Sequence, residues 1–219
     1  MEKAILDDPT DPEPLLLFAE QAVQDRRVTE ADLLYQKIDE ILPSYKGNDE
    51  RKKNYSIRLN SGRAAAAQFR EQYDQAKGFL DQWLALDPDA AAAHFRLGDV
   101  LFQLDKEKEG YAELQKANEL DSKIQSPEIT MGLLYDRKKD NENAAKWMEY
   151  AVTRVPNDVK QRLQVARWYW LKGNNAKAKE HIDGALAVEA DSVEALVMSG
   201  LLARHEKDLD TAEAVLNKA

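Results

Sequence analysis

Small residues recur at intervals of 34 residues along this chain, and no other feature limits its possible fold as strongly. If each 34-residue repeat is numbered from 1 to 34, positions 8 and 20 hold alanine or glycine in all six repeats. Position 8 is Ala19, Ala64, Gly98, Gly132, Ala166 and Gly200, and position 20 is Ala31, Ala76, Gly110, Ala144, Ala178 and Ala212. A period of 20–50 residues is typical of stacked arrays of short structural units. Each unit contacts only its neighbours, so a chain of 219 residues then needs no single central core.

Apolar residues within one repeat follow helical spacing, as residues 125–158 illustrate. Ile129 and Leu133 are four residues apart, on one face of a helix, and a polar turn follows them. A second apolar stripe begins at Ala144, and Pro156 ends it because proline cannot continue a helix. Each repeat is therefore predicted to be a helix–turn–helix of two short antiparallel helices, which makes the chain all-α.

The small residues have a mechanical role in this arrangement. Two helices that cross at positions 8 and 20 approach closely only if no bulky side chain holds their backbones apart. A large residue at Gly132 or Ala144 is therefore expected to destabilise the protein by about 1–3 kcal/mol through overpacking. In the fifth repeat, Gly173 lies in the turn between the helices, where glycine adopts a positive φ at low cost.

The residues at these positions resemble the tetratricopeptide repeat family, whose pattern is W-x2-L-G-x2-Y followed by A, F, A and P. The fourth repeat carries this pattern as Met131-Gly132, Tyr135, Ala144, Met148, Ala151 and Pro156. Position 4 lacks the usual tryptophan, which loosens the match. The resemblance implies an all-α, right-handed α-superhelical solenoid of about six helix-turn-helix repeats. It also implies a binding protein, since such solenoids present extended concave surfaces.

The whole chain is interpreted as a single array, residues 1–219. Its repeats are predicted at 12–45, 57–90, 91–124, 125–158, 159–192 and 193–219. Residues 1–9 fit the tail of a preceding repeat, and the last repeat is truncated and has no polar capping helix. Terminal repeats normally carry a polar outer face, so we expect a piece excised from a longer array.

Residues 46–56 form an insertion between the first two repeats. Gly47 followed by Asn48 and two acidic residues has the pattern of a stop followed by a helix start. The first helix of the second repeat is therefore predicted to begin near Asn48 and to be unusually long. A disordered loop is the alternative.

The composition excludes several classes of function. The formal net charge is −9, which argues against general binding of nucleic acid, because phosphate backbones require a basic surface. No run of 18 apolar residues occurs, so no membrane insertion is expected. The absence of cysteine excludes disulfides, thiolate zinc sites and cysteine nucleophiles, but it does not fix the compartment.

No motif for catalysis or cofactor binding is found. The three histidines, His94, His181 and His205, do not have the spacing of a zinc-binding helix, and structural or surface roles are favoured for them. No glycine-rich nucleotide motif occurs either, so no cofactor and no metal are expected. Without a convergent catalytic site, the chain is not predicted to be an enzyme.

The family resemblance implies that positions 2, 5, 6, 9, 12 and 13 of each first helix line a concave groove. The candidate groove residues are Phe69, Phe95, Arg96, Asp99, Phe102, Ile129, Leu133, Arg137, Lys160, Leu163, Arg167, Trp170, Leu201, Arg204 and His205. Aromatic and aliphatic anchors beside arginines are what interface hot spots favour. From the fourth repeat onward the polar members are mostly cationic, which indicates a partner peptide with apolar anchors and acidic character. The simpler interpretation is that these side chains cover helix seams and pair with nearby carboxylates.

The function predicted from these features is a protein–protein interaction scaffold that binds a partner peptide or helix in its groove. One alternative is the substrate-recognition arm of a larger multidomain enzyme, which the full-length gene product would reveal. Another is a self-assembling scaffold, which light scattering at several concentrations would detect.

Overall fold

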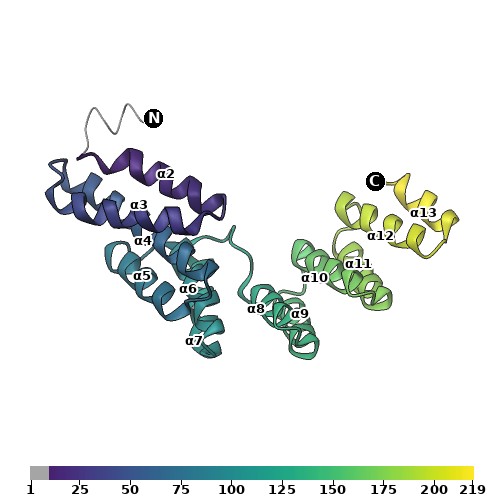
Figure 1. Cartoon of the computed structure of the whole chain (residues 1–219). Helices are drawn as coiled ribbons and strands as arrows, with labels where there is room; N and C mark the ends of the chain where they lie inside the picture. Colours follow the sequence, from purple (N-terminus) through teal and green to yellow (C-terminus); the bar gives the residue numbers. More distant parts are fainter. Residues whose placement is uncertain (1–9) are drawn as a thin grey trace. The chain divides into compact units, whose positions relative to one another are not determined.

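The computed structural model describes residues 10–219, and the regular secondary structure of this range is entirely helical. The described residues up to Ile124 form one compact unit, and Gln125–Ala219 form a second (Figure 1). The all-α fold expected from the sequence is therefore confirmed for this range. The predicted tail of a preceding repeat, residues 1–9, lies outside the described residues.

The first unit is a stack of three helical hairpins. They are α2 (Pro12–Gln24) with α3 (Val28–Ile41), α4 (Asp49–Phe69) with α5 (Tyr73–Leu86), and α6 (Ala91–Gln103) with α7 (Glu107–Leu120). A short 3-10 helix, η1 (Leu42–Ser44), follows α3. The hairpins are joined into a stack because α4 packs on α2 and α3, and α5 packs on α6.

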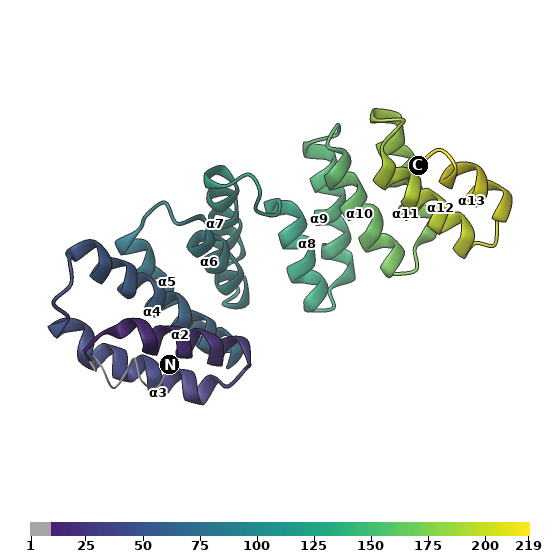
Figure 2. The same ribbon diagram turned by 90° about the horizontal axis from the view of Figure 1, so that it is seen from above.

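The second unit has the same construction. Its hairpins are α8 (Pro127–Arg137) with α9 (Asn141–Arg154), α10 (Val159–Leu171) with α11 (Asn175–Val188), and α12 (Val193–His205) with α13 (Leu209–Leu216). Helix α10 packs on α9 and α11 packs on α12, so the hairpins follow one another in chain order (Figure 2).

The turn between the two helices is the same in every hairpin of residues 10–219. The residue at position 15 of each repeat has a positive φ, between 58° and 75°. These residues are Arg26, Glu71, Asp105, Lys139, Gly173 and Lys207. The next backbone N–H then reaches back to a carbonyl five residues earlier, as in the 2.9 Å bond from Asn174 to Tyr169. This pattern is a Schellman motif, which satisfies carbonyls left unpaired at the helix end. The turn predicted at Gly173 is confirmed.

Substitutions at this turn position are predicted to have opposite effects at glycine and at the charged residues. Gly173→Ala is expected to destabilise the protein by about 1 kcal/mol, because a side chain at positive φ meets the following carbonyl. Lys139→Gly, at the equivalent position with φ 62°, is expected to stabilise it by about 0.5 kcal/mol, since the relief of strain exceeds the added entropy of the unfolded chain. Urea unfolding followed by circular dichroism measures both. Changes of the same sign would contradict the strain argument.

Helix α4 is longer than the other helices because it includes most of the predicted insertion. It begins at Asp49 and has 21 residues, and the Asn48 side chain caps it by accepting a 2.7 Å hydrogen bond from the Arg51 N–H. The predicted helix start is confirmed, and the alternative of a disordered loop is wrong. The added turns cover the core of the first hairpin, where Tyr55 is buried with its ring edge-on to Tyr45.

The helices of a hairpin cross where the sequence places its small residues. A Cβ atom built on Gly98 of α6 would lie 2.9 Å from the carbonyl oxygen of Gly110 on α7, and a Cβ built on Gly110 would lie 2.8 Å from the carbonyl oxygen of Gly98. The two backbones are thus in direct contact at this crossing. The alanines at positions 8 and 20 of the other repeats are buried as well. The mechanical role inferred for these residues is confirmed.

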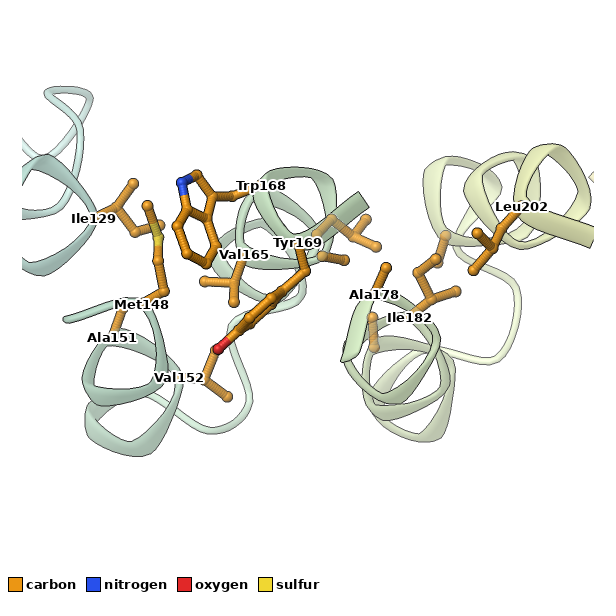
Figure 3. Packing of buried hydrophobic residues seen from close by; sticks show 14 of the residues in the cluster. Ile129, Met148, Ala151, Val152, Val165, Trp168, Tyr169, Ala178, Ile182 and Leu202 are labelled. Carbon is orange, nitrogen blue, oxygen red and sulfur yellow. The ribbon is translucent and has the colours of Figure 1, made fainter. Parts of the chain in front are cut away.

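Each unit has hydrophobic clusters of its own. In the second unit Met148 of α9, Tyr169 of α10 and Ile182 of α11 belong to one cluster, with buried alanines between the larger side chains (Figure 3). The cluster reaches Leu202 on α12, so one core runs through the hairpins of this unit. This core fixes the faces that α10 and α12 turn towards solvent.

Candidate functional site

Three exposed cationic side chains distinguish the first helices of the last two hairpins. Lys160 and Arg167 lie two helical turns apart on one face of α10, and Arg204 lies on α12. None of the three forms a hydrogen bond or an ion pair through its side chain with any residue in the range 10–219. Several other basic side chains of this unit are paired, as Lys146 is with Glu142 at 2.6 Å. The three cations are therefore available to a negatively charged partner.

Apolar and aromatic side chains accompany these cations. Half-buried Trp170, near the end of α10, meets the exposed His205 of α12 edge-on, with ring centroids 6.4 Å apart. Asn175 Nδ2 lies 3.4 Å from His205 Nδ1, which holds the imidazole beside α11. Leu201 on α12 is partly exposed, and Leu133 on α8 is 36% exposed. We call the set Leu133, Lys160, Arg167, Trp170, Leu201, Arg204 and His205 the cationic face.

Three predicted groove residues are core residues instead. Phe102 is completely buried, and Ile129 and Leu163 are each 2% exposed. Ile129 and Leu163 belong to the hydrophobic cluster of the second unit, because position 5 of the first helix faces the core there. A side chain without exposed surface cannot contact a partner, so the prediction for these three residues is wrong.

Arg96, the arginine predicted to line the groove in the first unit, forms hydrogen bonds within the protein. Arg96 of α6 donates hydrogen bonds to the Ser61 carbonyl at 2.9 Å and to Gln68 Oε1 at 2.8 Å, both on α4. Burial lowers the pKa of Arg96 below its usual range. Its neighbour Asp99 is half-buried and accepts a 3.4 Å hydrogen bond from Gln103. Arg96 therefore joins two helices of the stack and is not a free groove cation.

A second arginine of this kind escaped the sequence analysis. Arg58 of α4 donates from Nε and Nη2 to the two oxygens of Glu20, at 2.8 and 2.9 Å, and from Nη1 to Glu13 at 2.7 Å. The hydrogen bonds with Glu20 raise the pKa of Arg58 above its usual range. The signal in the sequence is a pair of carboxylates seven residues apart on α2, with a basic residue in the next repeat. Contacts between residues 38 or 45 positions apart do not follow from helical periodicity.

The remaining candidates, Phe69, Phe95 and Arg137, keep at least part of their surface exposed. Phe69, the last residue of α4, is 51% exposed, and Phe95 of α6 is half-buried. Arg137 is exposed at the end of α8 but has interactions of its own. The cationic face of the second unit is therefore the part of the predicted groove that keeps both unpaired charge and apolar surface.

A carboxylate of α9 organises a polar cluster inside the second unit that sequence reasoning also missed. Glu149 Oε1 accepts a 2.7 Å hydrogen bond from the Tyr169 hydroxyl and lies 3.3 Å from His181 Nε2 and 3.4 Å from Lys177 Nζ. The His181 ring is 2% exposed and stacks on Tyr169 with centroids 5.5 Å apart. The sequence favours a structural or surface role for His181, and this geometry shows a structural one.

The pKa of Glu149 reflects two opposing effects. Burial acts to raise it, but the hydrogen bond from Tyr169 and the interactions with His181 and Lys177 outweigh burial and hold the pKa below its usual value. Burial, together with the hydrogen bond to Glu149, raises the pKa of Tyr169. Glu149 is therefore ionised and the tyrosine neutral at neutral pH, so the cluster is a stable hydrogen-bond network.

No metal-binding or membrane-spanning feature is found in the described part of the chain. No group of three histidine, aspartate or glutamate side chains within residues 10–219 is arranged to hold a metal ion. None of the helices in that range combines the length and apolarity that a bilayer crossing requires.

Comparison with known proteins identifies the repeat. The family model of the tetratricopeptide repeat matches residues 59–122 and 166–219. Among solved structures, a tetratricopeptide repeat protein from Parabacteroides merdae is 16% identical, with a TM-score of 0.54 over 99% of this chain and 82% of that one. YrrB, described as a TPR protein with an unusual peptide-binding site, is 22% identical, with a TM-score of 0.53 over 95% of this chain and 97% of that one. PilF of Pseudomonas aeruginosa is 19% identical, with a TM-score of 0.52 over 93% and 88%. No curated protein matches this chain.

Proposed function

The chain belongs to the tetratricopeptide repeat family, whose members generally act as protein–protein interaction scaffolds, and on this premise we propose that its second unit binds an acidic peptide segment of a partner protein. The cationic face on α10 and α12 would hold this segment. The observation that carries the proposal is the set of unpaired cations, Lys160, Arg167 and Arg204, in a chain whose net charge is −9.

Charge complementarity supports an acidic partner. Arg167 and Arg204 each have no acidic side chain paired with them among the described residues, so each would be free to pair with a carboxylate of the partner. Arginine suits this role, because its planar guanidinium donates two parallel hydrogen bonds to a carboxylate. The negative charge elsewhere on the protein would direct an acidic segment towards the cationic face and away from other surfaces.

Apolar anchoring supports a peptide rather than a free anion. Trp170 keeps part of its ring exposed beside His205, and Leu133 and Leu201 add aliphatic surface. Tryptophan and arginine are the residues most enriched in binding hot spots. The expected ligand therefore combines acidic residues with at least one large apolar side chain.

Charge reversal tests the proposal. Peptides are selected from a displayed random library on the immobilised full chain, and affinities of the synthetic peptides are measured by calorimetry. The double variant Arg167→Glu/Arg204→Glu is expected to bind the selected peptides about 10- to 100-fold more weakly, because like charges replace attractive pairs. A peptide with lysine in place of its acidic residue should recover binding to the double variant.

The matched control changes the same total charge on other helices. Lys146 of α9 and Lys179 of α11 are 64% and 60% exposed in their side chains, so Lys146→Glu/Lys179→Glu tests for a general electrostatic effect. This control should keep most of the affinity, and Trp170→Ala should lose part of it without changing the dependence on salt. Equal loss in both charge-reversed variants, or selected peptides without acidic residues, would reject the cationic face as the site.

A further inference from the structure

A pocket of about 290 Å³ opens in the first unit. It lies where α3 meets α4 and α5. Its lining residues are Asp32 and Tyr35 of α3, Arg63, Ala67 and Arg70 of α4, and Gln72, Gln75 and Phe79 at and beyond the start of α5. Small-molecule sites begin at about this volume.

The pocket lies beside a small residue, Ala67, at a position where three of the other repeats carry a large one. Ala67 occupies position 11 of its repeat, whereas Leu101 and Tyr169 occupy that position in the third and fifth repeats and are buried there. Leucine and tyrosine fill the space between hairpins. Alanine leaves space there. Because the first and sixth repeats also have alanine at this position, as Ala22 and Ala203, the side chains around Ala67 contribute to the pocket as well.

Two basic residues at positions 7 and 14 supply the positive charge of the pocket. Arg63 occupies position 7, where the third and fifth repeats have the buried residues Leu97 and Val165. Arg70 occupies position 14, where the third repeat has Leu104 and the fourth and fifth have Lys138 and Lys172. Arg63 thus replaces an apolar side chain beside Ala67, and Arg70 adds a second guanidinium group to the lining.

Both guanidinium groups keep donors that no described residue uses. Arg63 bonds through Nη2 to Asp39 and to the Tyr35 carbonyl, and Arg70 bonds through Nη1 to Asp32. Nε and Nη1 of Arg63, and Nε and Nη2 of Arg70, have no partner among residues 10–219. The carboxylates that pair with these arginines are largely exposed, at 46% for Asp39 and 43% for Asp32.

The other lining residues indicate which chemical groups a ligand needs beside the arginines. The guanidinium of Arg63 lies over the Phe79 ring, 5.4 Å from its centroid, so charge and aromatic surface adjoin. Ala67 adds apolar surface, and Gln72 and Gln75 add amide groups. The lining contains two arginines and one carboxylate, Asp32, while Asp39, which pairs with Arg63, lies outside the lining.

We propose that this pocket binds a small organic anion with one carboxylate on an apolar or aromatic body. The free donors of Arg63 and Arg70 hold the carboxylate, as planar guanidinium groups do in bidentate pairs. The body of the ligand lies against Phe79 and Ala67. The same carboxylate chemistry could be supplied by a free organic acid or by a glutamate side chain of a partner.

The test uses benzoate as the probe and NMR spectra of the ¹⁵N-labelled full chain. Benzoate is expected to shift the backbone amides of residues 63–75 and the Nε–H signals of Arg63 and Arg70 in a saturable manner, with a dissociation constant of about 1 mM. Benzamide, which has the same ring and no charge, should bind at least about tenfold more weakly. Glutamate blocked at its amino and carboxyl ends tests the second source, a glutamate side chain of a partner. Whichever of benzoate and blocked glutamate binds more tightly shows which kind of carboxylate the pocket prefers.

Two variants separate the pocket from general anion binding. Ala67→Leu fills the space with the residue that the next repeat carries and leaves both arginines in place. Arg63→Leu/Arg70→Gln removes the donors and leaves the space. Each is expected to weaken benzoate binding at least about tenfold, whereas Arg167→Gln, in the other unit, should leave it unchanged.

Three results would overturn the proposal: no saturable shifts with either carboxylate up to about 20 mM, unchanged binding in Ala67→Leu, or benzamide binding as well as benzoate. If the arginine variant fails to fold, Ala67→Leu still decides the question, because leucine at this position suits the helix.

Discussion

Gly110→Leu is expected to lower the free energy of unfolding by about 3 kcal/mol, near the upper end of overpacking effects. A Cβ at this position would lie 2.8 Å from the Gly98 carbonyl oxygen and 3.2 Å from the Phe102 backbone nitrogen. Both are backbone atoms within α6, so no side chain can rotate away to make room. The two helices would have to separate, which would loosen the contacts along the hairpin.

Gly78→Leu is the matched control for this prediction. Gly78 also lies in the second helix of a hairpin, but a Cβ there meets nothing within 4 Å. Leucine is a better helix former than glycine, so this variant should be stabilised by up to about 1 kcal/mol. Urea unfolding followed by circular dichroism compares the two, and hydrogen exchange of α6 and α7 localises the effect. Similar stabilities of the two variants would show that the backbones of α6 and α7 are not in contact.

Glu149→Ala is expected to have the second large effect, a loss of about 2–4 kcal/mol, because it leaves two buried polar groups without their acceptor. The Tyr169 hydroxyl and His181 Nε2 both face Glu149 Oε1, and the two residues are 6% and 2% exposed. Tyr169→Phe removes the hydroxyl and leaves no orphaned donor, so it should cost only about 1 kcal/mol. A double-mutant cycle between the two positions measures their coupling.

The same carboxylate predicts a pH dependence. The pKa of Glu149 is lower in the folded protein than its ordinary value of 4.5, so its ionised form stabilises the fold. That contribution is complete above the ordinary value and disappears as the pH falls through the lower, folded-state pKa. The stability difference between the wild type and Glu149→Gln should therefore shrink as the pH is lowered from about 6 to 3. A difference that does not change over this range would show that the carboxylate is not stabilised by its neighbours.

The hairpins could be predicted because their determinants are local. Gly98 and Gly110 are 12 residues apart, and the close approach of two helices explains both without knowledge of the rest of the fold. The start of α4 was equally predictable, since Asn48 caps the helix by bonding to Arg51, three residues later. At the turns, glycine revealed only the fifth one. In the other five hairpins charged side chains have the same positive φ, and their residue type gives no sign of it.

The candidate site was harder to predict because it depends on contacts between hairpins. Periodicity places Leu163 and Arg167 on neighbouring parts of one helix face, but only the packing of the next helices decides that the first is buried and the second exposed. From the sequence alone, Arg96 resembles the cations of the second unit, because it also lies at a predicted groove position. Its acceptors, Ser61 and Gln68, are 35 and 28 residues earlier in the chain, so its pairing could not be predicted. The family pattern describes the groove, whereas the partners of each charged side chain are particular to this sequence.

The five turns with a charged residue at positive φ are also sites at which substitution can raise the stability of the protein. Each holds a residue other than glycine at a backbone conformation that costs about 1–2 kcal/mol. Glycine at several of these sites would add tolerance to heat without altering any helix face. Variants of the cationic face or of the arginine pocket that weaken the fold could thus be studied in such a background, where loss of binding would not be confused with loss of structure.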